Sequence, residues 1–296
     1  MSDGRTTRIP LQQAITACLA LGSVSLMAQE SPSNPVPEQS LGVVKAIDQV
    51  DDVNTTQIGK VPQSLRDIPQ AMTVINREVL DAQSATRLTD ALRNVPGITI
   101  SAGEGGQIGD NINLRGFSAR TDLFLDGFRD RGQYTRDTFF LQSVEVLKGP
   151  SSILFGRGST GGVINQSSKK PMLRDATEVA AAVGTDSYYR LSADVNAKLS
   201  DSSALRVVAL GHENKSTRDV VESKRYGINP SLRIGIGSDT EITASLMLQR
   251  NRETPDYGFP LLKFDGRLSK PIDAPANRYY GFTDDKFDQD VNNFNL

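Results

Sequence analysis

The chain has 296 residues, a length that allows one or two domains. A net charge of -2 and a charged fraction of 23% give no sign of a nucleic-acid-binding protein or of an acidic disordered tail. With one Cys and one His, the chain has neither an intrachain disulfide nor a Cys-based zinc site, and a catalytic triad would have to use His212.

Residues 1–28 have the pattern of a cleaved signal peptide for export. Arg5 and Arg8 precede a mildly apolar stretch that ends in small residues, and we expect cleavage after Ala28. The alternatives are lipidation at Cys18 and an uncleaved amphipathic helix. Residues 29–60 are expected to form a flexible tether, because residues 29–40 are rich in Pro, Ser and Gln.

Residues 61–171 have the mixed pattern of an α+β domain. Apolar residues at helical spacing predict a helix from Leu88 to Val95, which Pro96 and Gly97 should end. Short apolar runs separated by glycine-rich connections predict strands at residues 71–75, 98–101, 113–115, 122–125 and 144–148.

After Pro171, apolar and polar residues alternate with a period of two. The alternation covers residues 189–199, 226–236 and 242–248, which is typical of transmembrane β-strands with one face to lipid and one to a wet lumen. Tight turns at 200–203 and 237–240 and long connections at 211–224 and from 251 onward support this interpretation. One half of a soluble β-sandwich is the alternative.

The number of predicted strands is too small for a closed barrel. We count about five strands from Glu178 to Arg250, whereas the smallest common barrels have about eight. The polar residues 288–296 are interpreted as the middle of a loop. We therefore expect residues 172–296 to be the incomplete start of a barrel, in an N-terminal fragment of a longer protein.

Two motif matches lack the context that their chemistry needs. Residues 156–161 match the dinucleotide fingerprint G-x-G-x-x-G, but an extended segment follows where a helix is required. Residues 288–292 begin like a calcium loop without its later glycine and glutamate. His212 is interpreted as a plain surface or lumen residue, so the sequence does not predict an enzyme.

Several motifs, in one order, resemble the plug domain of TonB-dependent siderophore receptors. They are Val61–Ile75, Leu88–Gly97, Asn113–Phe117, Leu125–Gly127, Val144–Pro150, Leu154–Gly158, Gly161–Asn165 and Lys169–Pro171. Residues 255–287 are most similar to the catecholate siderophore receptors of this family. The resemblance implies an α+β plug, here residues 61–171, inside a transmembrane β-barrel of about 22 strands.

The resemblance also implies a partner at the inner membrane. TonB pulls on a short extended segment, the TonB box, which pairs by strand addition. Our candidate is the apolar strip Leu41, Gly42, Val43, Val44 and Lys45, which follows the predicted tether. A first plug strand is the alternative interpretation of this strip.

Candidate ligand contacts lie between Arg115 and Arg136, where arginine and aromatic residues are dense. A ferric tris-catecholate is anionic and aromatic, so guanidinium groups and ring faces suit it. We expect contacts from Arg115, Arg120, Arg129, Arg131 and Tyr134. The alternative is that these arginines pair with Asp122, Asp126, Asp130 and Asp137 to hold the domain together.

The resemblance therefore implies import of ferric siderophore, most simply of the catecholate type, across the outer membrane. Iron is expected only as part of the cargo, with no resident cofactor or metal. The expected partners are the TonB complex, a ferric catecholate and outer-membrane lipid, with no nucleic acid. The alternatives are another cargo such as haem, cobalamin or a carbohydrate, and a non-functional or periplasmic plug fragment.

Overall fold

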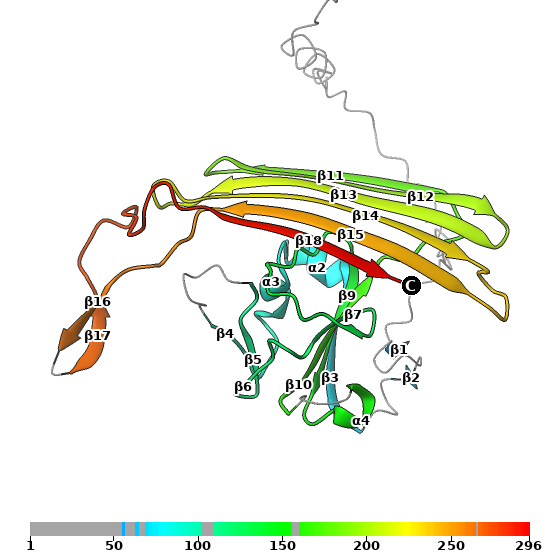
Figure 1. Cartoon of the computed structure of the whole chain (residues 1–296), viewed down its shortest axis with the longest axis horizontal. Coiled ribbons are helices and arrows are strands. Elements are labelled where there is room, and N and C mark those ends of the chain that lie inside the picture. Colours follow the sequence, from blue (N-terminus) through cyan, green and yellow to red (C-terminus); the bar gives the residue numbers. More distant parts are fainter. Residues whose placement is uncertain (1–54, 57–62, 65–68, 102–108, 156–159, 265) are drawn as a thin grey trace, which may run out of the picture. The chain divides into compact units, whose positions relative to one another are not determined.

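The computed structural model describes residues 55–56, 63–64, 69–101, 109–155, 160–264 and 266–296. The predicted signal peptide and the TonB-box candidate at 41–45 lie outside these residues. So does the predicted tether at 29–60, except for Thr55 and Thr56, which form a short strand. An α+β domain comes first and six long antiparallel strands follow it (Figure 1). No helix among the described residues is long and apolar enough to cross a membrane.

The α+β domain is built around a five-stranded mixed sheet of order β3-β9-β10-β7-β8. Its strands are β3 (Ala71–Asn76), β7 (Leu123–Leu125), β8 (Phe128–Arg129), β9 (Leu141–Lys148) and β10 (Gly162–Ser168). The strands β4 (Ile98–Ile100), β5 (Ile112–Leu114) and β6 (Phe117–Ser118) form a second small sheet. Short strands β1 (Thr55–Thr56) and β2 (Gln63–Ser64) pair with each other.

Three short helices complete this domain: α2 (Arg77–Ala82), α3 (Leu88–Leu92) and α4 (Ser152–Phe155). The Asn76 side chain caps α2 by accepting a hydrogen bond from the Val79 backbone N–H at 3.0 Å. Helix α3 confirms the predicted start at Leu88 but ends at Leu92, before the predicted end at Val95, and its apolar residues lie in the core together with those of β9. Gly97, with φ of +84°, lies in the turn after it.

Close backbone packing explains the two glycines at the start of β10, Gly161 just before the strand and Gly162 as its first residue. A Cβ on Gly161 would lie 2.2 Å from the Leu114 carbonyl oxygen, and a Cβ on Gly162 would lie 2.1 Å from that of Leu147. The chain then enters strand β10 directly, which confirms the extended segment that the sequence predicted here. The G-x-G-x-x-G match is therefore not a dinucleotide-binding site, because a strand and not a helix follows Gly161.

The six long strands form one antiparallel sheet of order β11-β12-β13-β14-β15-β18 (Figure 1). They are β11 (Ala176–Gly184), β12 (Tyr188–Ser200), β13 (Ser203–Lys215), β14 (Glu222–Ile234), β15 (Ile242–Glu253) and β18 (Phe287–Asn295). Five of them cover the region in which about five strands were predicted. A hairpin of β16 (Leu261–Phe264) and β17 (Arg267–Pro271) lies in the connection between β15 and β18.

The two faces of this sheet differ as the period of two predicts. Along β12, β14 and β15 the buried residues are mostly polar and alternate with exposed or half-buried apolar ones, whereas β13 buries Ala204, Val208 and Leu210. We call the face with the buried polar residues, which contacts the α+β domain, the inner face, and the other the outer face. Large apolar side chains exposed on the outer face include Leu191, Val195, Leu199, Ile228, Ile234 and Ile242.

Two sequence-based predictions about loops are wrong. Strands β13 and β14 continue through most of residues 211–224, and only residues 216–221 connect them. Residues 287–295 form strand β18, which pairs with β15, and are not the middle of a loop. In both places the outer face is charged, and cross-strand ion pairs such as Lys224–Glu213 (3.1 Å) and Arg250–Asp290 (3.0 Å) replace the apolar alternation.

Candidate functional site

A buried ion cluster joins the α+β domain to the inner face of the sheet. Asp137 is fully buried, and Arg190 of β12 binds its two carboxylate oxygens at 2.7 and 3.0 Å. Arg225 of β14, also fully buried, approaches the same carboxylate at 3.0 Å. The bidentate contact fixes the position of the carboxylate between the two strands.

The charges in this cluster compensate one another. Burial alone would raise the pKa of Asp137, but the guanidinium groups of Arg225 and Arg190 outweigh burial and lower it. The Phe139 backbone N–H also donates to this carboxylate at 2.9 Å. Asp137 is therefore ionised at neutral pH, and its charge is balanced by side chains of the sheet rather than by those of its own domain.

Amide side chains of the inner face bind the backbone just before Asp137. Gln249 and Asn251 of β15 both donate to the Thr135 carbonyl oxygen, at 2.6 and 3.2 Å. Gln289 of β18 donates to the Gln133 carbonyl oxygen at 2.9 Å. The segment 133–137 is thus held by side chains of four strands, β12, β14, β15 and β18.

A second cluster holds the end of the α+β domain. Asp194 of β12 accepts hydrogen bonds from Lys169 at 2.7 Å and from Arg206 of β13 at 2.8 Å. Asn196 accepts from the Met172 backbone N–H at 2.9 Å and donates to its carbonyl oxygen at 2.8 Å. This cluster lies where the chain passes from β10 into β11, so it anchors the covalent connection between the two parts.

The sequence-predicted residue Tyr134 is buried within the α+β domain. Its hydroxyl donates to Asp130 at 2.7 Å, and the Arg136 guanidinium lies 4.1 Å from the centre of its ring. Arg136 is itself buried and binds Asp130 and Asp110 at 2.9 and 3.2 Å. The predicted pairing of this stretch with Asp130 is confirmed for Arg136, whereas Asp137 pairs with the sheet instead.

The four predicted arginines have different surroundings. Arg129 is half-buried, lies 5.2 Å from the centre of the Phe124 ring and donates to the Phe155 carbonyl oxygen at 3.4 Å. Arg115, Arg120 and Arg131 are exposed, and in the described part of the chain their side chains form no hydrogen bond or ion pair. Arg115 has a positive φ of 53° in the turn between β5 and β6.

Sequence reasoning missed the cluster of Asp137, Arg190 and Arg225. The alternation of β12 and β14 already placed both arginines on the polar face, which was a usable signal. The carboxylate that pairs with these arginines belongs to the α+β domain. The spacing of residues within the strands therefore could not predict that it is Asp137. His212, between the two arginines in the strand register, is buried and bonded to Asn214 at 3.0 Å.

Comparison with known proteins identifies the relatives of both parts. Residues 64–163 match the family model described as TonB-dependent Receptor Plug Domain. The chain is 34% identical, over 99% of its length and 40% of the relative's, to the probable TonB-dependent siderophore receptor PiuA of Acinetobacter baumannii. The catecholate siderophore receptor Fiu of Escherichia coli K12 is 35% identical over 76% of this chain and 30% of its own.

The solved structures agree with the sequences. The crystal structure of PiuA from A. baumannii superposes with a TM-score of 0.73 at 36% identity, over 79% of this chain and 34% of that chain. The open form of the ferric-catecholate import receptor Fiu gives a TM-score of 0.64 at 35% identity, over 69% and 30%. The chain thus spans well under half the length of these relatives.

Proposed function

We propose that the chain supplies the plug and the first barrel strands of an outer-membrane importer of ferric siderophores. Residues 64–163 form a plug domain of the TonB-dependent receptor family, and the whole chain is homologous to siderophore receptors of that family. The plug closes the barrel lumen until TonB pulls on it. The protein is a transport receptor, and iron passes through it only as cargo.

The observation that carries this proposal is the polar contact between the plug and the inner face. Asp137, Thr135 and Lys169 of the plug meet arginine, amide and carboxylate side chains of the sheet there, and these polar contacts accompany a small apolar cluster in which Val208, Leu210 and Met247 of the sheet join the plug core. Apolar packing would have to be exposed to water when the plug moves, at a cost that grows with the exposed area. Polar groups can exchange their partners for lumen water, so the plug can be held firmly and still be displaced.

The cargo class follows from the exposed arginines of the plug. Within the described residues the guanidinium groups of Arg115, Arg120 and Arg131 form no hydrogen bond or ion pair, and such groups suit an anionic, aromatic ferric catecholate. Arg129 contacts the Phe124 ring and Tyr134 binds Asp130, and both contacts hold the segment that carries Arg131. The relative in E. coli is a catecholate siderophore receptor by name, which supports the same cargo class.

The proposed partners follow from the location. An importer in the outer membrane has no nucleotide supply, so it is energised by TonB, and the candidate contact is the strip Leu41–Lys45. The outer face of β11–β18 meets lipid. Export through a cleaved signal peptide at residues 1–28 delivers the chain to that membrane.

Arg131→Ala in the complete gene product tests the cargo site. Arg131 has no partner in the described residues, so its loss should weaken ferric-catecholate binding by about tenfold without lowering outer-membrane abundance. Binding is titrated on purified receptor, and abundance is read from immunoblots of membrane fractions. Arg252→Ala, an exposed arginine on the outer face of β15, is the matched control. Unchanged affinity in Arg131→Ala would remove this residue from the site.

A further inference from the structure

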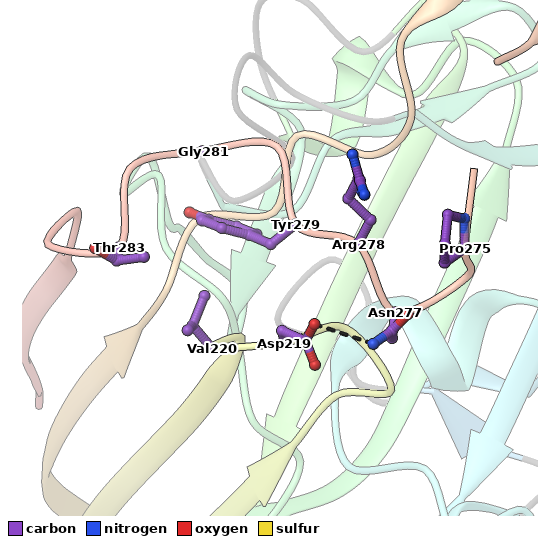
Figure 2. Close-up of a pocket in the computed structure, with 8 residues that line it drawn as sticks. All are labelled: Asp219, Val220, Pro275, Asn277, Arg278, Tyr279, Gly281 and Thr283. Atoms are coloured by element: carbon purple, nitrogen blue, oxygen red, sulfur yellow. Dashed lines mark hydrogen bonds between the residues drawn. The ribbon is translucent and has the colours of Figure 1, made fainter. Parts of the chain in front are cut away.

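A cavity lies between two connections at one end of the long-strand sheet. It has a volume of about 470 Å³ and is lined by residues of the β13–β14 connection, 216–221, and of the β15–β18 connection, 254–286 (Figure 2). This volume is within the range of about 300–1,000 Å³ that is usual for small-molecule sites. Its lining includes Asp219, Val220, Asn277, Arg278, Tyr279 and Thr283.

The two connections are tied together, so the cavity is formed before any ligand arrives. The Asp219 backbone N–H donates to the Asn277 carbonyl oxygen at 2.8 Å, and the Asn277 side chain donates to the Asp219 carboxylate at 3.0 Å. Arg218 pairs with Asp256 and lies 4.4 Å from the centre of the Phe259 ring. Preformed sites of this kind lose less entropy on binding than mobile loops do.

The cavity lining offers both hydrogen-bond donors and hydrogen-bond acceptors to a ligand. The second carboxylate oxygen of Asp219 and the amide oxygen of Asn277 are acceptors. Arg278 and Thr283 supply donors, and within the described residues their side chains have no hydrogen-bond partner. The Tyr279 hydroxyl donates to the Pro255 carbonyl oxygen at 2.9 Å, which fixes the ring. In Figure 2 this ring lies between Thr283 on one side and Asn277 on the other.

This combination is unsuited to an anion. Asp219 contributes a carboxylate to the lining, and burial together with the charges of Asp285 and Asp256 raises the pKa of Tyr279. Arg278 is the one cation in the described lining, and its charge is balanced by that of Asp219. A lining without net charge gives no electrostatic attraction for a ferric catecholate, which carries several negative charges.

A saccharide has the complementary chemistry. Each hydroxyl group of a sugar both donates and accepts a hydrogen bond, as paired acceptors and donors on the lining require. The C–H face of the ring is apolar and packs on an aromatic side chain such as Tyr279. We propose that the cavity between residues 219–220 and 275–283 is a saccharide-binding site, separate from the cargo site on the plug.

The position of the cavity indicates where the saccharide comes from. Both connections leave the end of the sheet opposite to the turns at 201–202 and 235–241, and longer connections of outer-membrane barrels face outward. Lipopolysaccharide surrounds that end with sugar residues. A free saccharide, or one attached to the cargo, would bring the same chemistry, so the test separates these sources.

The test uses the complete gene product, purified in detergent and stripped of bound lipopolysaccharide. The probes are D-glucose, D-galactose, N-acetyl-D-glucosamine and core oligosaccharide released from lipopolysaccharide by mild acid. Saturation-transfer NMR detects binding, and titration gives the affinity. Arg278→Ala and Thr283→Val remove donors without breaking a contact within the described residues, and Lys270→Ala, an exposed cation on β17 outside the cavity, is the matched control.

We expect at least one probe to bind, with affinity about tenfold weaker in Arg278→Ala and in Thr283→Val and unchanged in Lys270→Ala. Binding of the core oligosaccharide alone assigns the site to lipopolysaccharide, and binding of a monosaccharide assigns it to a soluble or cargo-linked sugar. Failure of all four probes to bind the wild-type protein, or equal binding by the Arg278 and Thr283 variants, overturns the proposal. Ferric-catecholate affinity should be the same in all variants, so this result is independent of the proposed transport.

Discussion

Replacing Asp137 with asparagine should loosen the plug from the inner face. The substitution keeps the shape of the side chain and removes the charge that Arg190 and Arg225 share. Breaking a buried ion pair by removing one partner costs about 3–5 kcal/mol, because the remaining charge stays desolvated. Arg225 is 1% exposed and has no other carboxylate at ion-pair distance in the described residues. Its guanidinium charge would therefore stay buried without a counter-charge in the variant.

The expected magnitude lies at the low end of this range. Asparagine retains one oxygen as an acceptor, and Arg190, at 14% exposed, can gain some hydration. A loss of about 3 kcal/mol raises the open fraction of the segment by a factor on the order of 100. Hydrogen–deuterium exchange of peptides covering residues 133–142, measured on the complete gene product, reports this opening.

Asp201→Asn is the control for the loss of a charge in itself. Asp201 is fully exposed in the turn between β12 and β13, where its pair with Lys198 is screened by water. Exchange in residues 133–142 should not change in this variant. If Asp137→Asn exchanges within about threefold of the wild type, or if Asp201→Asn loosens the plug as much, the ion cluster does not hold the plug.

Two further predictions use the same contact between plug and sheet. Arg225 and Arg190 hold the pKa of Asp137 below its ordinary value of 3.8 in spite of burial, so the stabilisation by this carboxylate is present above pH 3.8 and is lost as the pH falls further. The difference in hydrogen exchange between wild type and Asp137→Asn should therefore persist from pH 7 to pH 4 and shrink only below pH 3.8. A difference that shrinks between pH 7 and pH 5 would contradict this assignment. Gly227→Ala places a Cβ 2.6 Å from the buried Phe139 ring, so the ring must move at a cost of about 1–3 kcal/mol, seen as faster exchange around Phe139. Gly211→Ala, where a Cβ meets nothing within 4 Å, should leave exchange unchanged.

The strands that could be predicted are those whose outer face is apolar. Residues 189–199 and 242–248 alternate cleanly because the side chains of the outer face and those that face the plug have opposite requirements. Strand β18 was missed because Asp288, Asp290 and Asn292 occupy its outer face, so the sequence reads as a polar loop. Pairing with β15 and the Arg250–Asp290 ion pair stabilise it, and neither can be seen in the strand's own residues.

The residues of the candidate site were harder to predict from the sequence than the strands of the fold. Arginine and aromatic residues between 115 and 136 were visible as a group, but burial divides them: Arg136 and Tyr134 support the plug, whereas Arg131 reaches solvent. The partner of Asp137 depends on contacts 53 and 88 residues away in the chain, at Arg190 and Arg225. Such pairs are set by the docking of a domain on a sheet, for which one sequence carries no periodic signal.

Uptake of radiolabelled iron as a ferric tris-catecholate is the decisive test of whether the complete gene product imports this cargo. Cells that lack their own catecholate receptors are given the complete gene, and uptake is compared in strains with and without TonB. We expect iron to accumulate above the empty-vector level only when both the gene and TonB are present, and we expect no such accumulation of haem or cobalamin. Uptake that does not depend on TonB, or its absence while the protein is abundant in the outer membrane, would contradict this expectation.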